Sequence, residues 1–215
     1  MFDNKNIVKK GLLLVISGPS GAGKGTICKE LLNYDDNYWL SVSATTRAPR
    51  KGEVDGVNYY FLSKENFIEK IDKNQFLENA EVYGNYYGTP KESVLSKIEA
   101  GKDVILEIDI QGALKVKETY PEGVFIFILP PSMEELKRRI INRGSETDES
   151  LVTRFKSAYK EVNYVSKYNY AVINDEVQSA VKKIESIITA EKCSVDRMKD
   201  NILSKEGLIH EQIYD

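Results

Sequence analysis

Hydrophobic and polar positions follow two alternating patterns along this chain. Four short runs are mostly apolar and end in glycine, proline or polar residues: residues 12–16, 104–109, 124–129 and 170–173. Runs of this length fit strands that are buried on both faces of a sheet. Between the runs, apolar positions recur at the spacing of amphipathic helices, in residues 24–32, 92–100, 134–142 and 177–190. Strands separated by helices predict an α/β fold, in which a parallel sheet is flanked by helices.

Residues 43–88 interrupt this alternation. They are rich in tyrosine and glycine, with a strand-like piece at residues 59–62 and a helix-like piece at residues 65–73, and we interpret them as an inserted lobe of mixed α/β structure. A second interruption, residues 143–149, is polar and charged, which suits a mobile flap within a helical lid. The predicted core comprises residues 1–42, 91–132 and 165–192. The inserted lobe is predicted at residues 43–90, the helical lid at 133–164 and a C-terminal tail at 193–215.

Composition narrows the class of protein. The chain has 30 lysines and arginines against 33 aspartates and glutamates, and this slight acidity argues against a general nucleic-acid binder. Two distant cysteines, Cys28 and Cys193, and a single histidine, His210, argue against a zinc site, a disulfide framework and a histidine-dependent triad. The first apolar run is too short for a secretory or membrane segment. We therefore expect a soluble cytoplasmic protein without nucleic-acid or membrane partners.

A glycine-rich sequence connects the first predicted strand to the first predicted helix. Its glycines allow successive backbone N–H groups to point at a phosphate, and the helix N-terminus adds a positive dipole. Lys24 supplies a charge for the β- and γ-phosphates of a nucleotide. The predicted nucleotide-binding residues of this P-loop are Gly18, Pro19, Ser20, Gly21, Ala22, Gly23, Lys24, Gly25 and Thr26. The usual P-loop has serine or threonine directly after its lysine to meet Mg²⁺, whereas here Gly25 follows Lys24, so the metal ligands stay open.

Two groups of basic residues are candidates for binding further phosphates. Arg47 and Arg50 lie in a turn-rich stretch followed by Tyr59, and guanidinium groups bind phosphate oxygens bidentately. Taken alone, this stretch also fits a solvated basic loop. Arg139 and Arg143 are four residues apart, which at helical spacing places them on one face, as an anion clamp requires. A solvated basic helix paired with nearby glutamates is the alternative.

Taken together, these residues resemble the guanylate kinase family. The acceptor motif of that family is matched at Thr45, Thr46, Arg47, Arg50, Glu53, Gly56, Tyr59 and Phe61. The P-loop precedes the motif at the expected distance, and residues 108–112, 130–132 and 143–147 also resemble the family. The resemblance extends from about residue 12 to residue 190, and such a long combined motif is far more specific than a P-loop alone.

The resemblance implies a P-loop kinase core with an inserted GMP-binding lobe and a helical lid. It also implies the reaction ATP + GMP to ADP + GDP, with Mg²⁺ as the metal. The implied ligands of the GMP phosphate are Arg47, Arg50, Tyr59 and Tyr87. The implied residues around guanine are Ser43, Glu78, Thr89 and Asp109. The implied catalytic residues are Lys24, Arg47, Arg139, Arg143 and Arg154.

Glu78 is the candidate for choosing guanine. Guanine presents its N1–H and its 2-amino group side by side, and one carboxylate can accept from both, whereas adenine offers no such donor pair. Residues 172–175 are a weaker candidate for contacting the adenine of ATP, with a simple strand-end turn as the alternative.

Two other functions stay open at this point. One is a kinase-like binding module without catalysis, against which the intact P-loop and Lys24 speak. The other is a P-loop kinase with a different phosphorylated acceptor, against which the combination of Ser43, Glu78 and Asp109 speaks.

Overall fold

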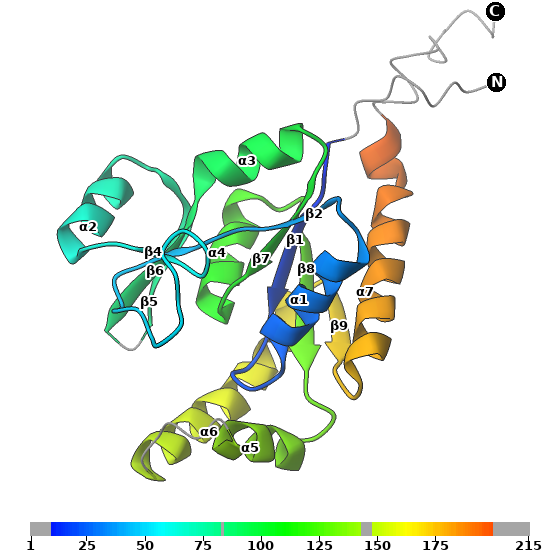
Figure 1. Cartoon of the computed structure of the whole chain (residues 1–215). Helices are drawn as coiled ribbons and strands as arrows, with labels where there is room; N and C mark the ends of the chain where they lie inside the picture. The colour runs from blue at the N-terminus through cyan, green and yellow to red at the C-terminus, as the bar shows by residue number, and fades with distance from the viewer. Residues whose placement is uncertain (1–9, 83, 143–147, 200–215) are drawn as a thin grey trace, which may run out of the picture.

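The computed structural model describes residues 10–82, 84–142 and 148–199, with the backbone alone for residues 142 and 148–154. Five parallel strands form its central sheet in the order β2-β7-β1-β8-β9 (Figure 1). Their bounds are Leu13–Ser17 for β1, Tyr38–Leu40 for β2, Asp103–Glu107 for β7, Val124–Leu129 for β8 and Tyr170–Ile173 for β9. Because the P-loop follows β1, it lies at the carboxyl edge of the sheet, next to the ends of β7 and β8.

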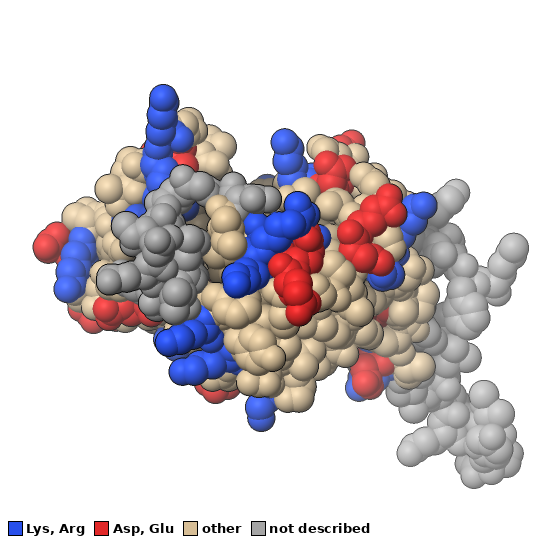
Figure 2. All heavy atoms as spheres, turned by 90° about the horizontal axis from the view of Figure 1, so that it is seen from below, with Lys and Arg blue, Asp and Glu red and all other residues tan. Residues whose placement is uncertain are grey.

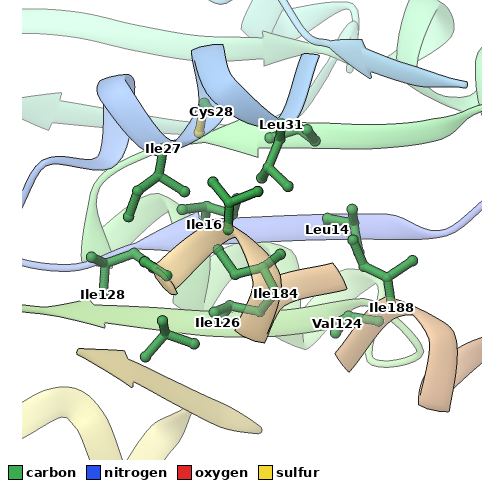
Figure 3. Packing of buried hydrophobic residues seen from close by; sticks show 14 of the residues in the cluster. Leu14, Ile16, Ile27, Cys28, Leu31, Val124, Ile126, Ile128, Ile184 and Ile188 are labelled. Atoms are coloured by element: carbon green, nitrogen blue, oxygen red, sulfur yellow. The ribbon is translucent and has the colours of Figure 1, made fainter. Parts of the chain in front are cut away.

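Helices cover both faces of this sheet (Figure 1). α1 (Lys24–Tyr34) and α7 (Val177–Lys192) pack against one face, and α3 (Lys91–Glu99) and α4 (Ile110–Thr119) pack against the other. Figure 3 shows the first of these layers, where Leu14 and Ile16 of β1 meet apolar side chains of α1, α7 and β8. Leu13 and Val15 of β1 point into the opposite layer. The strand is therefore apolar at every position because both of its faces are buried.

A second, four-stranded sheet forms the inserted lobe. Its order is β4-β3-β6-β5, with β3 and β4 parallel and the other pairs antiparallel. The bounds are Ala44–Thr45 for β3, Tyr60–Phe61 for β4, Phe76–Val82 for β5, Asn85–Pro90 for β6 and Lys64–Asp72 for the covering helix α2. Phe67 of α2 stacks on Phe76 of β5, with ring centroids 4.5 Å apart. A Cβ added at Gly88 would lie 3.0 Å from both rings, so this close packing favours glycine.

Two further helices and a 3₁₀ turn lie at the P-loop end of the molecule. α5 (Met133–Asn142) and α6 (Asp148–Val162) pack together through Leu136, Ile140 and Ala158, and α6 leads into the 3₁₀ helix η2 (Asn163–Lys167). Figure 1 shows the pair projecting below the sheet, beyond the loop between β1 and α1.

The predicted strands and helices are confirmed, with shifted bounds for some. The run at residues 104–109 ends as a strand at Glu107, because Asp109 instead caps α4 by accepting the Gly112 N–H at 3.0 Å. The sequence pattern missed α4, whose first turn contains glycine, a weak helix former. It also missed β2, which has only three residues and pairs on one side with β7.

Candidate functional site

A cavity of about 300 Å³ lies between the P-loop and the inserted lobe, and it brings together residues that are far apart in the sequence. From the P-loop, it is lined by Gly18, Ser20, Gly21, Gly23, Lys24 and Gly25. From the other predicted site residues, it is lined by Ser43, Tyr59, Glu78, Tyr87 and Asp109. The remaining lining residues were not predicted: Val82, Glu107, Ile108, Ile110 and Glu161. The cavity lies at the carboxyl edge of the parallel sheet, which is where α/β proteins bind their ligands.

The backbone of the P-loop is held by hydrogen bonds from its own lysine and from Asn174. Lys24 Nζ folds back and donates to the carbonyls of Gly18 at 2.6 Å and Pro19 at 3.2 Å. The carbonyl of the buried Ala22 accepts from Asn174 Nδ2 at 2.8 Å. Gly23 has a φ of 95°, and a Cβ added there would lie 2.3 Å from Asn174 Nδ2. Both its left-handed backbone and this close approach therefore require glycine.

Glu78 is a buried carboxylate in the wall of the cavity, with only 6% of its surface exposed. Its Oε1 accepts a hydrogen bond of 2.7 Å from the hydroxyl of Thr89, its cross-strand partner on β6. A Cβ added at Gly112 would lie 2.7 Å from its Oε2, so glycine allows α4 to approach the carboxylate. Burial raises the pKa of Glu78 to about 7, against the lowering effect of the Thr89 hydrogen bond.

The other predicted guanine residues have different places. Asp109 lines the cavity near Glu78 and also caps α4, and Ser43 lines the cavity from the start of the lobe. Thr89 is fully buried behind Glu78 and is outside the cavity lining. The structure therefore places Thr89 as the residue that orients Glu78.

Arg47 is held in a cluster of aromatic and acidic side chains. Its Nη2 donates to both carboxylate oxygens of Glu53, at 2.9 and 3.0 Å, and Glu53 raises its pKa. Its guanidinium carbon lies 5.4 Å from the ring centroid of Tyr59, whose ring meets that of Tyr87 edge to face. The two tyrosines line the cavity while Arg47 lies behind them, and the side chain of Arg50 is exposed.

The basic residues of the predicted lid are only partly described. Arg139 Nε donates to Glu135 at 2.8 Å, and its Nη1 and Nη2 reach the carbonyls of Ala22 at 3.4 Å and Asn174 at 3.2 Å. Arg139 thus lies beside the P-loop but outside the cavity lining. Arg143 lies outside the described residues, and so does the side chain of Arg154 in α6. Figure 2, viewed toward the end that carries α5 and α6, shows cationic and acidic side chains intermixed.

Two of the unpredicted lining residues carry charge. Glu107 ends β7, and a Cβ added at Gly25 would lie 3.3 Å from its Oε1. The rule that ligands bind at the carboxyl ends of parallel strands could have identified it. Glu161 of α6 accepts the backbone N–H of Ser20 at 3.2 Å, across 141 residues of sequence. No local pattern marks Glu161, because its contact depends on how α6 packs.

The part of the chain that the structure describes contains no group of three or more histidine, cysteine, aspartate or glutamate side chains arranged to hold a metal ion. Within the same residues, no helix combines the length and apolarity needed to cross a bilayer.

Comparison with known proteins agrees with this geometry. A family model described as "Guanylate kinase" matches residues 10–191. The chain is 72% identical over 209 residues to the guanylate kinase of Clostridium tetani, covering 97% of this chain and 100% of that protein. It is 74% identical over 208 residues to the guanylate kinase of Clostridium acetobutylicum, covering 96% of this chain and 99% of that protein.

A solved structure shows the same likeness in three dimensions. The crystal structure of guanylate kinase from Anaplasma phagocytophilum matches with a TM-score of 0.77 at 35% sequence identity, over 94% of this chain and 98% of that one. Sequence similarity over nearly the full length and similarity of fold thus lead to the same conclusion: the chain belongs to the guanylate kinase family and has its P-loop kinase fold.

Proposed function

We infer that this chain transfers the γ-phosphoryl group of ATP to GMP, producing ADP and GDP. The observation that carries this inference is the composition of one cavity, which has the P-loop and Lys24 on one side and the buried Glu78 with Asp109 on the other. Transfer of a phosphoryl group from a nucleoside triphosphate to GMP requires two facing sites. One binds the phosphates of the triphosphate, and the other accepts hydrogen bonds from the two adjacent donors of guanine. Family membership supports the same reaction.

On the donor side, the P-loop N–H groups and Lys24 would bind the phosphates of ATP. Charge spreads over the oxygens of the transferring group, so fixed positive charge at that point lowers the barrier. Arg139 lies beside the loop at Ala22 and supplies a further cation close to this position. We propose the same role for Arg143 and Arg154, as the sequence predicts.

On the acceptor side, Glu78 would accept hydrogen bonds from guanine N1–H and the 2-amino group, with Asp109 and Ser43 beside it. Arg47, Arg50, Tyr59 and Tyr87 would bind the GMP phosphate. That phosphate is already anionic and nucleophilic, so no side chain need act as a general base. The protein then contributes alignment of the two substrates, stabilisation of charge and exclusion of water.

Mg²⁺ is the metal that we propose for this reaction. Mg²⁺ in kinase sites is commonly bound by one or two carboxylates together with substrate phosphates and water, and it lowers the barrier by offsetting phosphate charge. Glu107 fits that chemistry, because its carboxylate lies against the P-loop at Gly25 and lines the cavity. A site of this kind needs no cluster of three protein ligands.

A coupled ADP-release assay with GMP, dGMP, AMP, UMP and CMP tests the proposal. We expect turnover with GMP and dGMP and little with the others. Turnover with a different nucleotide would indicate a different acceptor, and no turnover with any of them would favour a binding module.

We also propose a cytoplasmic location, because Cys28 and Cys193 are free thiols, which reducing compartments maintain.

Glu53→Gln tests how Arg47 is held. Glu53 orients the guanidinium of Arg47 but also offsets its positive charge. Loss of the orientation would weaken GMP binding, whereas loss of the opposing negative charge would strengthen it. We expect orientation to dominate and the Kd for GMP to rise about tenfold, because hydrogen bonds to charged groups contribute about 1.5 kcal/mol or more. Calorimetric titration measures this, with kcat recorded separately. Glu69→Gln removes the same charge from the exposed surface of α2 and serves as the control. Tighter GMP binding by the Glu53 variant would contradict the positioning role.

The raised pKa of Glu78 predicts a pH dependence. Below about pH 7 the carboxyl is protonated in the free enzyme and cannot accept from both guanine donors. We expect the kcat/KM for GMP, divided by that of Glu78→Gln, to rise about tenfold between about pH 6 and about pH 8. Division by the variant cancels the second ionisation of the GMP phosphate, near pH 6. A ratio that stays constant with pH would show that Glu78 does not titrate in this range.

The same raised pKa has a consequence for stability. A carboxyl whose pKa is higher in the folded than in the unfolded chain binds protons more tightly when folded. The contribution of Glu78 to the free energy of unfolding is therefore complete below its ordinary pKa of 4.5 and is lost as the pH rises to about 7.

A further inference from the structure

Glu161 is the one acidic side chain of α6 that touches the P-loop within the described residues. Its Oε2 accepts the backbone N–H of Ser20 at 3.2 Å, and both residues line the cavity. The contact joins a helix outside the core to the loop that would bind the nucleotide phosphates. The carboxylate of Glu161 has no role in the phosphoryl transfer proposed for this chain.

The acceptor that the Ser20 N–H meets in this structure is itself an anion. Backbone N–H groups of a P-loop at the start of a helix favour phosphate oxygens, and a carboxylate oxygen is a comparable anionic acceptor. Burial raises the pKa of Glu161 above its ordinary value, although the hydrogen bond from the Ser20 N–H and the positive charge of Lys24 act in the opposite direction. A nucleotide brings several negative charges into the same cavity, where charges repel more strongly than in water.

We propose that Glu161 is a displaceable occupant of the donor-phosphate site: its carboxylate holds the Ser20 N–H in the nucleotide-free protein, and the phosphates of the nucleotide displace it. Nucleotide binding then releases the link between α6 and the P-loop. The identity of the nucleotide rests on the proposed function, whereas the contact itself does not.

Displacement of Glu161 predicts the direction in which removal of its carboxylate changes the affinity for nucleotide. A contact that exists in the free protein and breaks on binding stabilises the free state and weakens the affinity for nucleotide. A contact that merely shapes the P-loop would persist in the complex, and its removal would weaken binding instead. The two roles therefore predict opposite changes in Kd.

Calorimetric titration with ADP in the absence of Mg²⁺ tests this direction. Glu161→Gln keeps the size of the side chain but removes its charge, and we expect ADP to bind about fivefold tighter, in the usual range of coupling between sites. Glu161→Asp keeps the charge but withdraws it by one methylene from Ser20, and we expect it to bind ADP tighter as well. The matched control is Glu81→Gln, because exposed Glu81 lines a neighbouring cavity together with Glu161 and loses the same charge.

Several outcomes would overturn the proposal. Equal or weaker ADP binding by Glu161→Gln would assign Glu161 a structural role. Tighter binding by Glu161→Gln alone, with Glu161→Asp unchanged, would assign the effect to local charge without displacement. An equal gain in the Glu81 control would assign it to overall charge. Failure of the wild-type protein to bind ADP would contradict the proposed function too, and the phosphotransfer assay then separates the two conclusions.

A spectroscopic measurement checks the contact directly and does not depend on turnover. We expect the amide ¹H and ¹⁵N shifts of Ser20 to follow the titration of Glu161 in the free protein. This dependence should disappear in Glu161→Gln and in wild-type protein saturated with ADP. A pH dependence that persists with ADP bound would show that the carboxylate stays in place, against the proposal.

Discussion

Lys24→Ala is expected to lower kcat for phosphoryl transfer by about 10²- to 10³-fold, because removal of one preorganised charge from a transition state commonly costs about 3 kcal/mol or more. Lys24 begins α1 in the wall of the cavity, and its Nζ lies over the P-loop carbonyls of Gly18 and Pro19. The KM for ATP should also rise, because the same charge attracts the phosphates before the reaction. Steady-state kinetics with ATP and GMP measure both effects.

The fold should survive this substitution, since Lys24 contributes little to the apolar core. Lys29→Ala is the matched control, because Lys29 lies exposed on the same helix and removes the same charge away from the cavity. Thermal unfolding of both variants shows whether they are folded. Near-normal turnover by a folded Lys24→Ala protein would mean that the P-loop lysine does not contact the transferring group.

Glu78→Gln is expected to lower the kcat/KM for GMP by about 10- to 150-fold, because each unpaired buried polar group costs about 1–3 kcal/mol. The amide has one acceptor oxygen where the carboxylate has two, so it would face one of the two guanine donors with a donor of its own. The hydroxyl of Thr89 already donates to Oε1 of Glu78, so the acceptors at this site are limited. Measurements with GMP and AMP report the loss of discrimination.

AMP supplies the internal control for this variant, because adenine lacks the paired donors and should lose little of any weak activity. ATP binding should also be unchanged, because Glu78 lies on β5 of the inserted lobe, whereas the P-loop belongs to the core. An equal loss for GMP and AMP would mean that Glu78 only supports the lobe. No loss for either nucleotide would mean that it does not touch the base.

Much of the fold was predictable because it depends on local patterns. The run at residues 124–129 coincides with β8, since a strand with both faces buried is apolar over its whole length. The run at residues 170–173 coincides with β9, but the expectation of burial on both faces is wrong there, because β9 is an edge strand in which only Val172 is buried. The P-loop was recognisable because its glycines stand between a buried strand and a helix. Two of the missed elements, α4 and β2, have weak local signals: a glycine in the first helical turn, and a strand of three residues.

The site was predictable only in part, and for different reasons at different residues. Lys24 follows from the motif and its position alone. The assignment of Glu78 came from family resemblance, because a single acid within a strand of the lobe has no distinguishing local pattern. The pairing of Arg47 with Glu53 and the orienting role of Thr89 became visible only in the structure.

The sequence by itself thus determined where the parallel strands and their helices lie, where the P-loop stands and to which family the chain belongs. Only the tertiary structure decided which residues meet: the side chain of Glu78 beside Gly112, that of Arg139 at the Ala22 carbonyl, and that of Glu161 at the Ser20 N–H. The physical reason is that periodicity reports burial and backbone conformation within a segment. Contacts between segments depend instead on how whole elements pack, and one glycine, such as Gly112, can decide how closely they approach.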